Sequence, residues 1–207
     1  MIEELLPGSK AKMRVLRSIY EHPGINLSSL IYTVKASPNF VLRYVNLLLA
    51  RGVLQENRIE GKKKTHMRIL KPNLATEMGR GIFYFVEMEK KISFLEKYPS
   101  LQPYADQLEE LCTRHNIVVI VYGSYARLAA GPESDLDLLF IGKVDKNILR
   151  SIQEIFITLE TELSLKVETT AGFLKQKSKS LYQNVLKEHT VLCGGWSFMN
   201  IIKKVYG

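Results

Sequence analysis

Apolar side chains recur at helical spacing in three segments near the start of the chain. Residues 9–21 form the first segment, which ends at a Pro-Gly pair. A second, shorter segment covers about 27–34. The third covers residues 38–51, where a Ser-Pro pair provides an N-cap oxygen and a favoured first residue, and a glycine follows the last turn. The pattern predicts three short helices.

Two strand-like segments follow these helices. They are VLQENRI and THMRIL, joined by EGKKK, a glycine-containing turn rich in lysine, and together they predict a β-hairpin. Beyond the hairpin the pattern is helical from Phe83 onward, because Gly79 and Gly81 weaken the residues before it. QPYADQLEELCTRHN predicts a further amphipathic helix.

The second half of the chain mixes strand patterns with helical ones. Residues 117–122 are a continuous apolar run, which is typical of a strand buried on both faces. Gly123-Ser124 follows at once, and YARLAA then favours a helix. The segment after Asp135 predicts a second strand, and LSLKVETT predicts a third.

Charge is unevenly distributed along this pattern. Lys and Arg number 29 against 21 Asp and Glu, a formal net charge of +8. Residues 1–72 carry 13 basic and 5 acidic side chains, whereas residues 73–207 carry 16 of each. The asymmetry suggests a polyanionic partner for the first part.

The remaining global features exclude several classes of protein. The histidines are scattered without zinc-ligand spacing. The opening MIEELLPGSK is unlike a signal peptide, and no apolar run reaches the roughly 20 residues of a membrane span. We therefore expect a cytoplasmic protein with no membrane segment.

Three helices followed by a basic hairpin resemble a winged helix-turn-helix, and SPNFVLRYVNLLLARGVLQ resembles the recognition helix and wing entry of that family. The resemblance implies that the helix from Pro38 enters the major groove of double-stranded DNA while the wing follows the backbone. Basic side chains of the wing would then meet phosphates, which adds affinity without sequence choice. These side chains are Arg58, Lys62, Lys63, Lys64 and Arg68.

The predicted third helix has two distinct faces. The face opposite its apolar core positions carries Asn39, Arg43 and Asn46, residue types suited to bidentate contacts with base edges. Apolar residues flank this strip on both sides, which suggests that one flank packs on a homodimer partner or on the C-terminal domain. A helix-turn-helix that serves only as a protein-contact module is the alternative.

Asp135 and Asp137 are two residues apart at the start of a predicted strand, so both carboxylates project from one face. Such a pair suits Mg²⁺, which prefers hard oxygen ligands and is typically shared between carboxylates and substrate phosphates. Glu168, on the polar face of the third predicted strand, would complete a two-metal site. Together with an anion-binding turn at Gly123-Ser124, these acids describe nucleotidyl transfer.

GSYARLAAGPESDLDLLF resembles the signature of the DNA polymerase β-type nucleotidyltransferase superfamily, and in particular its minimal nucleotidyltransferase branch. The resemblance covers roughly residues 100–207 and implies an α/β fold with a short mixed sheet, two Mg²⁺ ions and a nucleoside triphosphate, first of all ATP, as substrate. Leu128 stands where that branch commonly has glycine. Asp135, Asp137 and Glu168 would be catalytic and metal-binding. The nucleotide-binding residues would be Gly123, Ser124, Arg127 and Ser134.

The sequence therefore predicts an α+β or α/β protein with three parts: a winged helix-turn-helix at residues 1–72, a helical linker at 73–99 and a nucleotidyltransferase domain at 100–207. We expect an enzyme that moves a nucleoside monophosphate to a hydroxyl acceptor, while the winged helix binds DNA. The acceptor could belong to a protein, such as a toxin-like partner, to a small molecule or to a nucleic-acid end. The alternative is a DNA-binding transcriptional regulator whose nucleotidyltransferase-like domain only senses nucleotide or dimerises.

Overall fold

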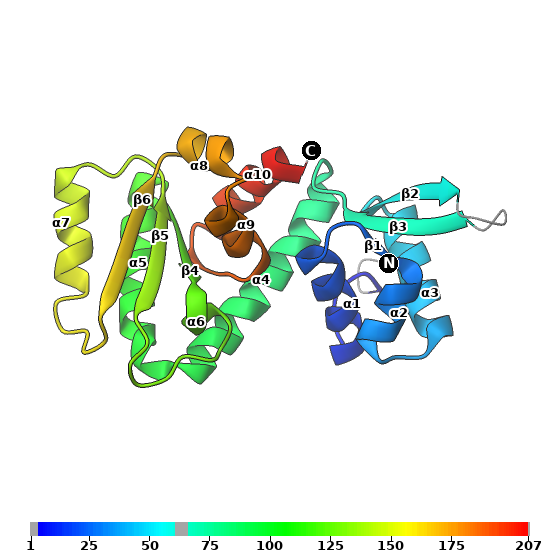
Figure 1. Ribbon diagram of the computed structural model, residues 1–207, viewed down its shortest axis with the longest axis horizontal. Coiled ribbons are helices and arrows are strands. Elements are labelled where there is room, and N and C mark those ends of the chain that lie inside the picture. The colour runs from blue at the N-terminus through cyan, green and yellow to red at the C-terminus, as the bar shows by residue number, and fades with distance from the viewer. Residues whose placement is uncertain (1–3, 61–65, 207) are drawn as a thin grey trace. The chain divides into compact units, whose positions relative to one another are not determined.

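The structure is a computed structural model that describes residues 4–60 and 66–206 (Figure 1). The chain divides into two compact units, and the boundary between them falls inside one long helix, between Val86 and Glu87. The predicted lysines of the hairpin tip, Lys62, Lys63 and Lys64, lie outside the described residues. Within the described part of the chain, no helix combines the length and apolar character needed to cross a bilayer.

The first unit contains three helices and a small antiparallel sheet. In chain order its elements are α1 (Lys10–Glu21), β1 (Ile25–Asn26), α2 (Leu27–Val34), α3 (Pro38–Ala50), β2 (Leu54–Glu60) and β3 (His66–Pro72). The strand order is β1-β3-β2, and β2 and β3 form the hairpin visible in Figure 1. The three helices and the hairpin predicted from the apolar pattern are confirmed as elements.

Local side-chain chemistry sets the ends of α3. The Oγ atom of Ser37 accepts a hydrogen bond from the backbone N–H of Phe40 at 3.3 Å, and Pro38 occupies the first turn. Gly52, with φ +68°, provides the left-handed conformation after the helix. The predicted core face is confirmed, since Val41, Val45 and Leu48 are all fully buried.

Helix α4 (Glu77–Lys97) begins six residues before its predicted start at Phe83. Glycine has a low helix propensity, so Gly79 weakens the first turns of this helix. In the structure its lack of a side chain allows another part of the backbone to pack closely against it. A Cβ atom at Gly79 would collide with the carbonyl oxygen of Asn73. Thr76 also stabilises this turn, because its Oγ1 atom accepts the N–H of Gly79 at 3.0 Å. The expected cost of a helical glycine is therefore accompanied by a close backbone approach and by a Thr76 cap at the helix start, neither of which helix propensity includes.

The second unit is a four-stranded mixed sheet between two layers of helices. After α4 its elements are a 3₁₀ turn (Pro99–Leu101), α5 (Gln102–His115), β4 (Val118–Tyr122), α6 (Gly123–Ala126), β5 (Leu136–Ile141), α7 (Lys146–Ile155), β6 (Leu163–Glu168), α8 (Thr170–Gln176), α9 (Ser180–Lys187), β7 (Thr190–Cys193) and α10 (Gly195–Tyr206). The strand order is β6-β5-β4-β7, with β5 and β6 parallel and the other two pairs antiparallel. This is the short mixed sheet that the resemblance implies.

Alternation along the strands divides the sheet into two faces. One face packs against α5 and α7, which appear behind and beside the strands in Figure 1, and its core includes Val121, Leu138, Phe140 and Ile152. The other face carries Asp137 and the polar positions of β6, and α8, α9 and α10 contribute the buried aromatic residues Phe173, Tyr182 and Phe198 to this half of the unit. The acidic face of the sheet is therefore distinct from its purely apolar face.

Gly194, between β7 and α10, allows a test of this packing. It adopts φ +70°, and a Cβ atom there would lie 2.6 Å from the carbonyl oxygen of Ile117. We predict that Gly194→Ala lowers the free energy of unfolding by about 1–3 kcal/mol through backbone strain and this close approach. The matched control is Gly131→Ala, since a Cβ atom at Gly131 meets nothing within 4 Å. Urea unfolding would measure both, and equal stabilities of the two variants would contradict the packing described.

Candidate functional site

The central feature of the second unit is the pairing of β4 with β5. This antiparallel register sets Tyr122, the last residue of β4, opposite Asp137. Gly123 follows immediately with φ +72°, and a Cβ atom at this position would collide with the Oδ2 atom of Asp137. Position 123 therefore requires glycine for two reasons: the backbone is left-handed there, and the Asp137 carboxylate occupies the place of a Cβ atom. The pairing brings the Gly-Ser turn beside Asp137, from which it is separated in sequence.

The two aspartates differ in exposure. Asp135 is exposed in the extended segment just before β5, whereas Asp137 is half-buried within the strand. Leu136 between them is buried in the apolar core, so the predicted alternation is present. We refer to Gly123, Ser124, Asp135 and Asp137 together as the aspartate site.

The helix predicted over YARLAA is shorter than expected. α6 covers only Gly123–Ala126 and ends where Leu128 adopts a left-handed conformation with φ +57°. This conformation suits glycine, and it accounts for the glycine that is common in the related branch at the position of Leu128. A single turn has a small dipole, so any anion held here depends on local N–H groups and the Ser124 hydroxyl rather than on a long helix.

Hydrogen bonds hold the loop between the turn and the aspartates. The Oγ atom of Ser134 accepts the backbone N–H of Gly131 at 3.0 Å, and the hydroxyl of Tyr98 accepts the N–H of Ala130 at 3.2 Å. The half-exposed Arg127 pairs with Glu188 at 3.4 Å. Ser134 thus shapes the loop, and Arg127 already has an acidic partner beside the predicted phosphate position.

The structure does not bring Glu168 to the aspartate site. β6 pairs with β5 so that Ser164 lies opposite Asp137, and Glu168 lies opposite Ile141. Four residues along a strand correspond to about 13 Å. The Glu168 carboxylate instead accepts hydrogen bonds from the hydroxyl of Tyr182 at 2.5 Å and from the amide of Gln176 at 3.0 Å. Among the described residues, no three acidic, histidine or cysteine side chains form a metal-binding group. In this structure the register of β5 and β6 therefore separates Glu168 from the two aspartates along the strands, and a metal-binding role for Glu168 stays a prediction.

Two residues beside the aspartate site were not predicted. Ser164 occupies the strand position opposite Asp137 and hydrogen-bonds the hydroxyl of Tyr122. Burial raises the pKa of Tyr122, and the negative charge of Asp137 raises it further. No sequence signal points to Ser164, because its importance follows entirely from how two distant strands align.

The predicted DNA-contacting residues of the first unit fall into two groups. Asn39 and Arg43 are exposed on α3, opposite its buried face. Arg68 of β3 instead donates hydrogen bonds to Asn46 at 2.9 Å and to Glu56 at 2.8 Å. Asn46 and Arg68, both predicted to bind DNA, therefore link α3 to the hairpin.

Glu56 lies at the centre of this second group. Arg58 also contacts its carboxylate, at 3.1 Å, while remaining 69% exposed. The hydrogen bond from Arg68 is the main factor that lowers the pKa of Glu56, and Arg58 contributes in the same direction.

Comparison with known proteins agrees with the geometry of the second unit. The family model described as a nucleotidyltransferase domain matches residues 105–193. A candidate protein adenylyltransferase of Methanocaldococcus jannaschii is 33% identical over 75 residues, which are 36% of this chain and 75% of the relative. The chain belongs to the nucleotidyltransferase family. It is a nucleotidyltransferase enzyme, and the matched region contains the whole aspartate site. No solved structure gives a significant match to the chain.

The contacts of Glu168 generate a prediction that separates structure from metal binding. Removing the Tyr182 hydroxyl or the Glu168 carboxylate breaks a hydrogen bond to a charged group. We predict that Tyr182→Phe and Glu168→Ala each lower the free energy of unfolding by about 1–3 kcal/mol. Calorimetry should show Mg²⁺-dependent ATP binding unchanged in both folded variants. Loss of that binding in Glu168→Ala alone would assign Glu168 to the metal site.

The same pair has a characteristic pH dependence. Burial and the hydrogen bond to Glu168 raise the pKa of Tyr182 from 10.0 to about 12. A raised folded-state pKa stabilises the fold below pH 10, and this contribution is lost as the pH rises towards 12. The stability difference between the wild type and Tyr182→Phe should therefore narrow across that range in urea titrations.

Proposed function

We propose that the second unit transfers a nucleoside monophosphate from a nucleoside triphosphate, ATP first among them, to a hydroxyl acceptor, with Asp135 and Asp137 as metal ligands. The closeness of Gly123 to the Asp137 carboxylate carries this proposal. A triphosphate held at the Gly-Ser turn would lie directly beside the two acids. Membership of the nucleotidyltransferase family supports the same reaction class.

The donor set of the aspartate site fits Mg²⁺. The ion typically uses one or two carboxylates and completes its coordination with water and substrate phosphates, so two aspartates are sufficient. When bound, Mg²⁺ would neutralise charge that develops on the transferring phosphoryl group. The two expected ions depended on a third acid. We now propose that the protein binds one ion directly, and that any second ion depends on the nucleotide.

The residues of the chain then have distinct roles. Asp135 and Asp137 hold the metal, and the Ser124 hydroxyl with nearby backbone N–H groups orients the phosphates. Ser134 keeps the loop in place through Gly131. We propose that Arg127 exchanges its partner Glu188 for a phosphate oxygen when nucleotide binds, since both side chains are about half exposed.

We predict that Asp135→Asn/Asp137→Asn removes the Mg²⁺ dependence of ATP binding and weakens binding in the presence of Mg²⁺ by at least about tenfold, which corresponds to 1.4 kcal/mol. The reason is the loss of both anionic ligands with little change in size. Isothermal titration calorimetry with and without Mg²⁺ measures the effect. Asp106→Asn is the matched control, because Asp106 is an exposed aspartate on α5. Binding by the double variant that equals the wild type, with no metal dependence, would remove this proposal.

We further propose that the first unit is a winged helix-turn-helix that binds double-stranded DNA. Support comes from the order of three helices and a hairpin, and from the exposed Asn39 and Arg43 on α3. In this arrangement Arg43 contacts base edges, Arg58 and the lysines at 62–64 contact phosphates, and Arg68 holds the hairpin against α3.

For this unit we predict that Arg43→Gln weakens binding of a cognate duplex by about 1–3 kcal/mol, the usual effect of removing a bidentate pair with a base. Replacing the lysines at 62–64 with alanine should instead make DNA affinity less dependent on salt. The slope of log K against log salt concentration should decrease by up to about 0.9 for each phosphate that a lysine no longer neutralises. Arg150→Gln is a charge-matched control on α7. Fluorescence anisotropy provides the measurement, and no retention of duplex DNA at low salt would leave this unit as a protein-contact module.

The acceptor and the oligomeric state remain predictions. The name of the Methanocaldococcus jannaschii relative, a protein adenylyltransferase, favours a protein hydroxyl as the acceptor. A toxin-like protein partner and a homodimer were expected from the sequence, and each is proposed here on that basis alone.

A further inference from the structure

The electrical neutrality of the second unit conceals a strong internal separation of charge. Residues 87–162 contain 8 basic and 13 acidic side chains, a net charge of −5. Residues 163–207 contain 7 basic and 2 acidic side chains, a net charge of +5. The positive part is the segment from β6 to the end of the chain. A unit that carries no net charge thus has one acidic and one basic part.

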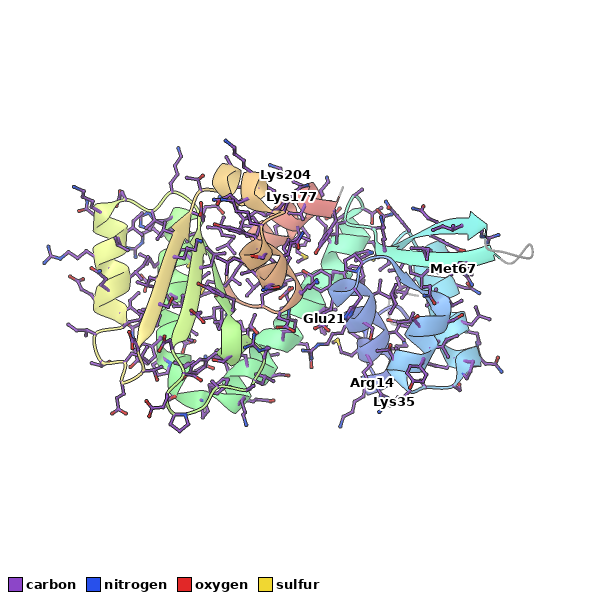
Figure 2. The ribbon with its side chains drawn as sticks, in the orientation of Figure 1. Arg14, Glu21, Lys35, Met67, Lys177 and Lys204 are labelled. Carbon is purple, nitrogen blue, oxygen red and sulfur yellow. The ribbon has the colours of Figure 1, made fainter. Side chains whose placement is uncertain are left out.

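Five exposed lysines gather in the basic part. Lys175, Lys177 and Lys179 lie in and just after α8, and Lys203 and Lys204 lie in the last turn of α10. The two elements are in contact, because the Nζ atom of Lys177 donates to the backbone carbonyl of Val205 at 3.2 Å. Figure 2 shows Lys177 and Lys204 side by side. We call this group the lysine surface.

Nearby acidic side chains do not neutralise the lysine surface. The two acids of residues 163–206 are Glu168, whose carboxylate is held by Tyr182 and Gln176, and Glu188, which pairs with Arg127. Among the described residues, none of these five lysines forms an ion pair. Like charges on one surface repel one another, so such a cluster costs stability and suits an external polyanion.

The lysine surface also connects to the aspartate site along β6. Ser164, Lys166 and Glu168 share one face of this strand, and Ser164 lies opposite Asp137. Lys166 is therefore midway along the roughly 13 Å that separate Ser164 from Glu168. Its Nζ atom lies 5.0 Å from the ring centre of Tyr182. A positive charge thus stands between the lysine surface and the two aspartates.

We propose that the lysine surface binds the phosphodiester backbone of a single nucleic-acid strand, whose terminal hydroxyl is the acceptor at the aspartate site. This inference rests on the proposed function and specifies its acceptor as a nucleic-acid end, in place of the protein hydroxyl that the relative's name favours. Transfer of label to a protein, with none to a strand, would overturn it. In the transfer, the hydroxyl oxygen attacks the α-phosphorus of the triphosphate, and the bond from that phosphorus to the bridging oxygen of pyrophosphate breaks. A phosphodiester forms, pyrophosphate leaves, and the hydroxyl proton passes to solvent.

The composition of the surface favours nucleic acid over a protein partner. Lysine is depleted in protein–protein interfaces, where aromatic and apolar side chains form the centre. Interfaces with nucleic acid are more polar and more positively charged. The exposed aromatic residue beside the lysines is Tyr206, at 40% exposure, which follows Lys203 and Lys204 at the end of α10 and offers one stacking position for a base.

The test compares two charge-matched variants of the full chain. The surface variant replaces Lys175, Lys179, Lys203 and Lys204 with glutamine and retains Lys177, which caps α10. The control variant replaces the exposed Lys97, Lys143, Lys146 and Arg150 with glutamine, all from the acidic part of the unit. Both are made in a background with alanine at 62–64, so that the hairpin of the first unit does not mask the result.

Anisotropy with short fluorescent RNA and DNA single strands measures binding without any need for catalysis. We expect the surface variant to bind at least tenfold more weakly than the control, with a log–log salt slope reduced by about 0.7 for each phosphate left without its lysine. Equal binding by the two variants overturns the inference. Retention of anionic vesicles or of an acidic polypeptide, with no retention of either nucleic acid, also overturns it.

A second readout separates this inference from the proposed function. Transfer of label from α-labelled ATP to the strand should show a raised KM for the strand in the surface variant and an unchanged KM for ATP. If the lysine surface binds strands but no variant transfers label, the proposed reaction fails while the binding site stands. If label is transferred equally well by the surface and control variants, the reaction stands and the lysine surface does not bind the acceptor.

Discussion

The register between β4 and β5 is the constraint on which the second unit depends. With Tyr122 opposite Asp137, the turn at Gly123 meets the carboxylate that the next strand supplies. Shifting this register by one residue would turn Asp137 into the apolar core and bring Leu136 or Leu138 to the polar face. The buried valines and leucines of the two strands therefore fix the acidic site as well as the fold. The geometry of the aspartate site and the packing of the core are specified by the same alternation.

Local features of the chain predicted most elements of the fold. Ser37-Pro38 and Gly52 defined α3 because capping is short-ranged. The early start of α4 was missed because helix propensity disfavours Gly79, whereas in the structure this glycine allows the carbonyl of Asn73 to approach closely. α6 was predicted too long because propensity ignores the left-handed conformation at Leu128. Each error arose where a close backbone contact or an unusual backbone conformation outweighed intrinsic helix propensity.

The candidate site, like the fold, was predictable only where its residues lie close together in the sequence. The Gly-Ser turn and the paired aspartates lie within one continuous motif, so the sequence alone was enough to propose them as a site. The third acid was expected from a different strand, where alternation gives the face of a residue but not its height along the sheet. Glu168 is on the expected face and Ser164 is at the required height, opposite Asp137. Only the pairing of β5 with β6 distinguishes these two residues.

The distribution of charge was also only partly predictable from the sequence. Composition indicated the basic first unit and a neutral remainder, because a sum over residues 87–207 cancels the opposite net charges of two successive segments. In the second unit the acidic part includes both aspartates, and the lysine surface lies beyond the opposite end of β6. A polyanion that approaches the second unit would be attracted by the lysine surface. It would be repelled by the carboxylates of the aspartate site unless a metal ion neutralised them. If metal and nucleotide bind at the aspartates as proposed, they would remove the repulsion that opposes entry of a strand. The proposed metal ligands would then favour an order in which the acceptor arrives last.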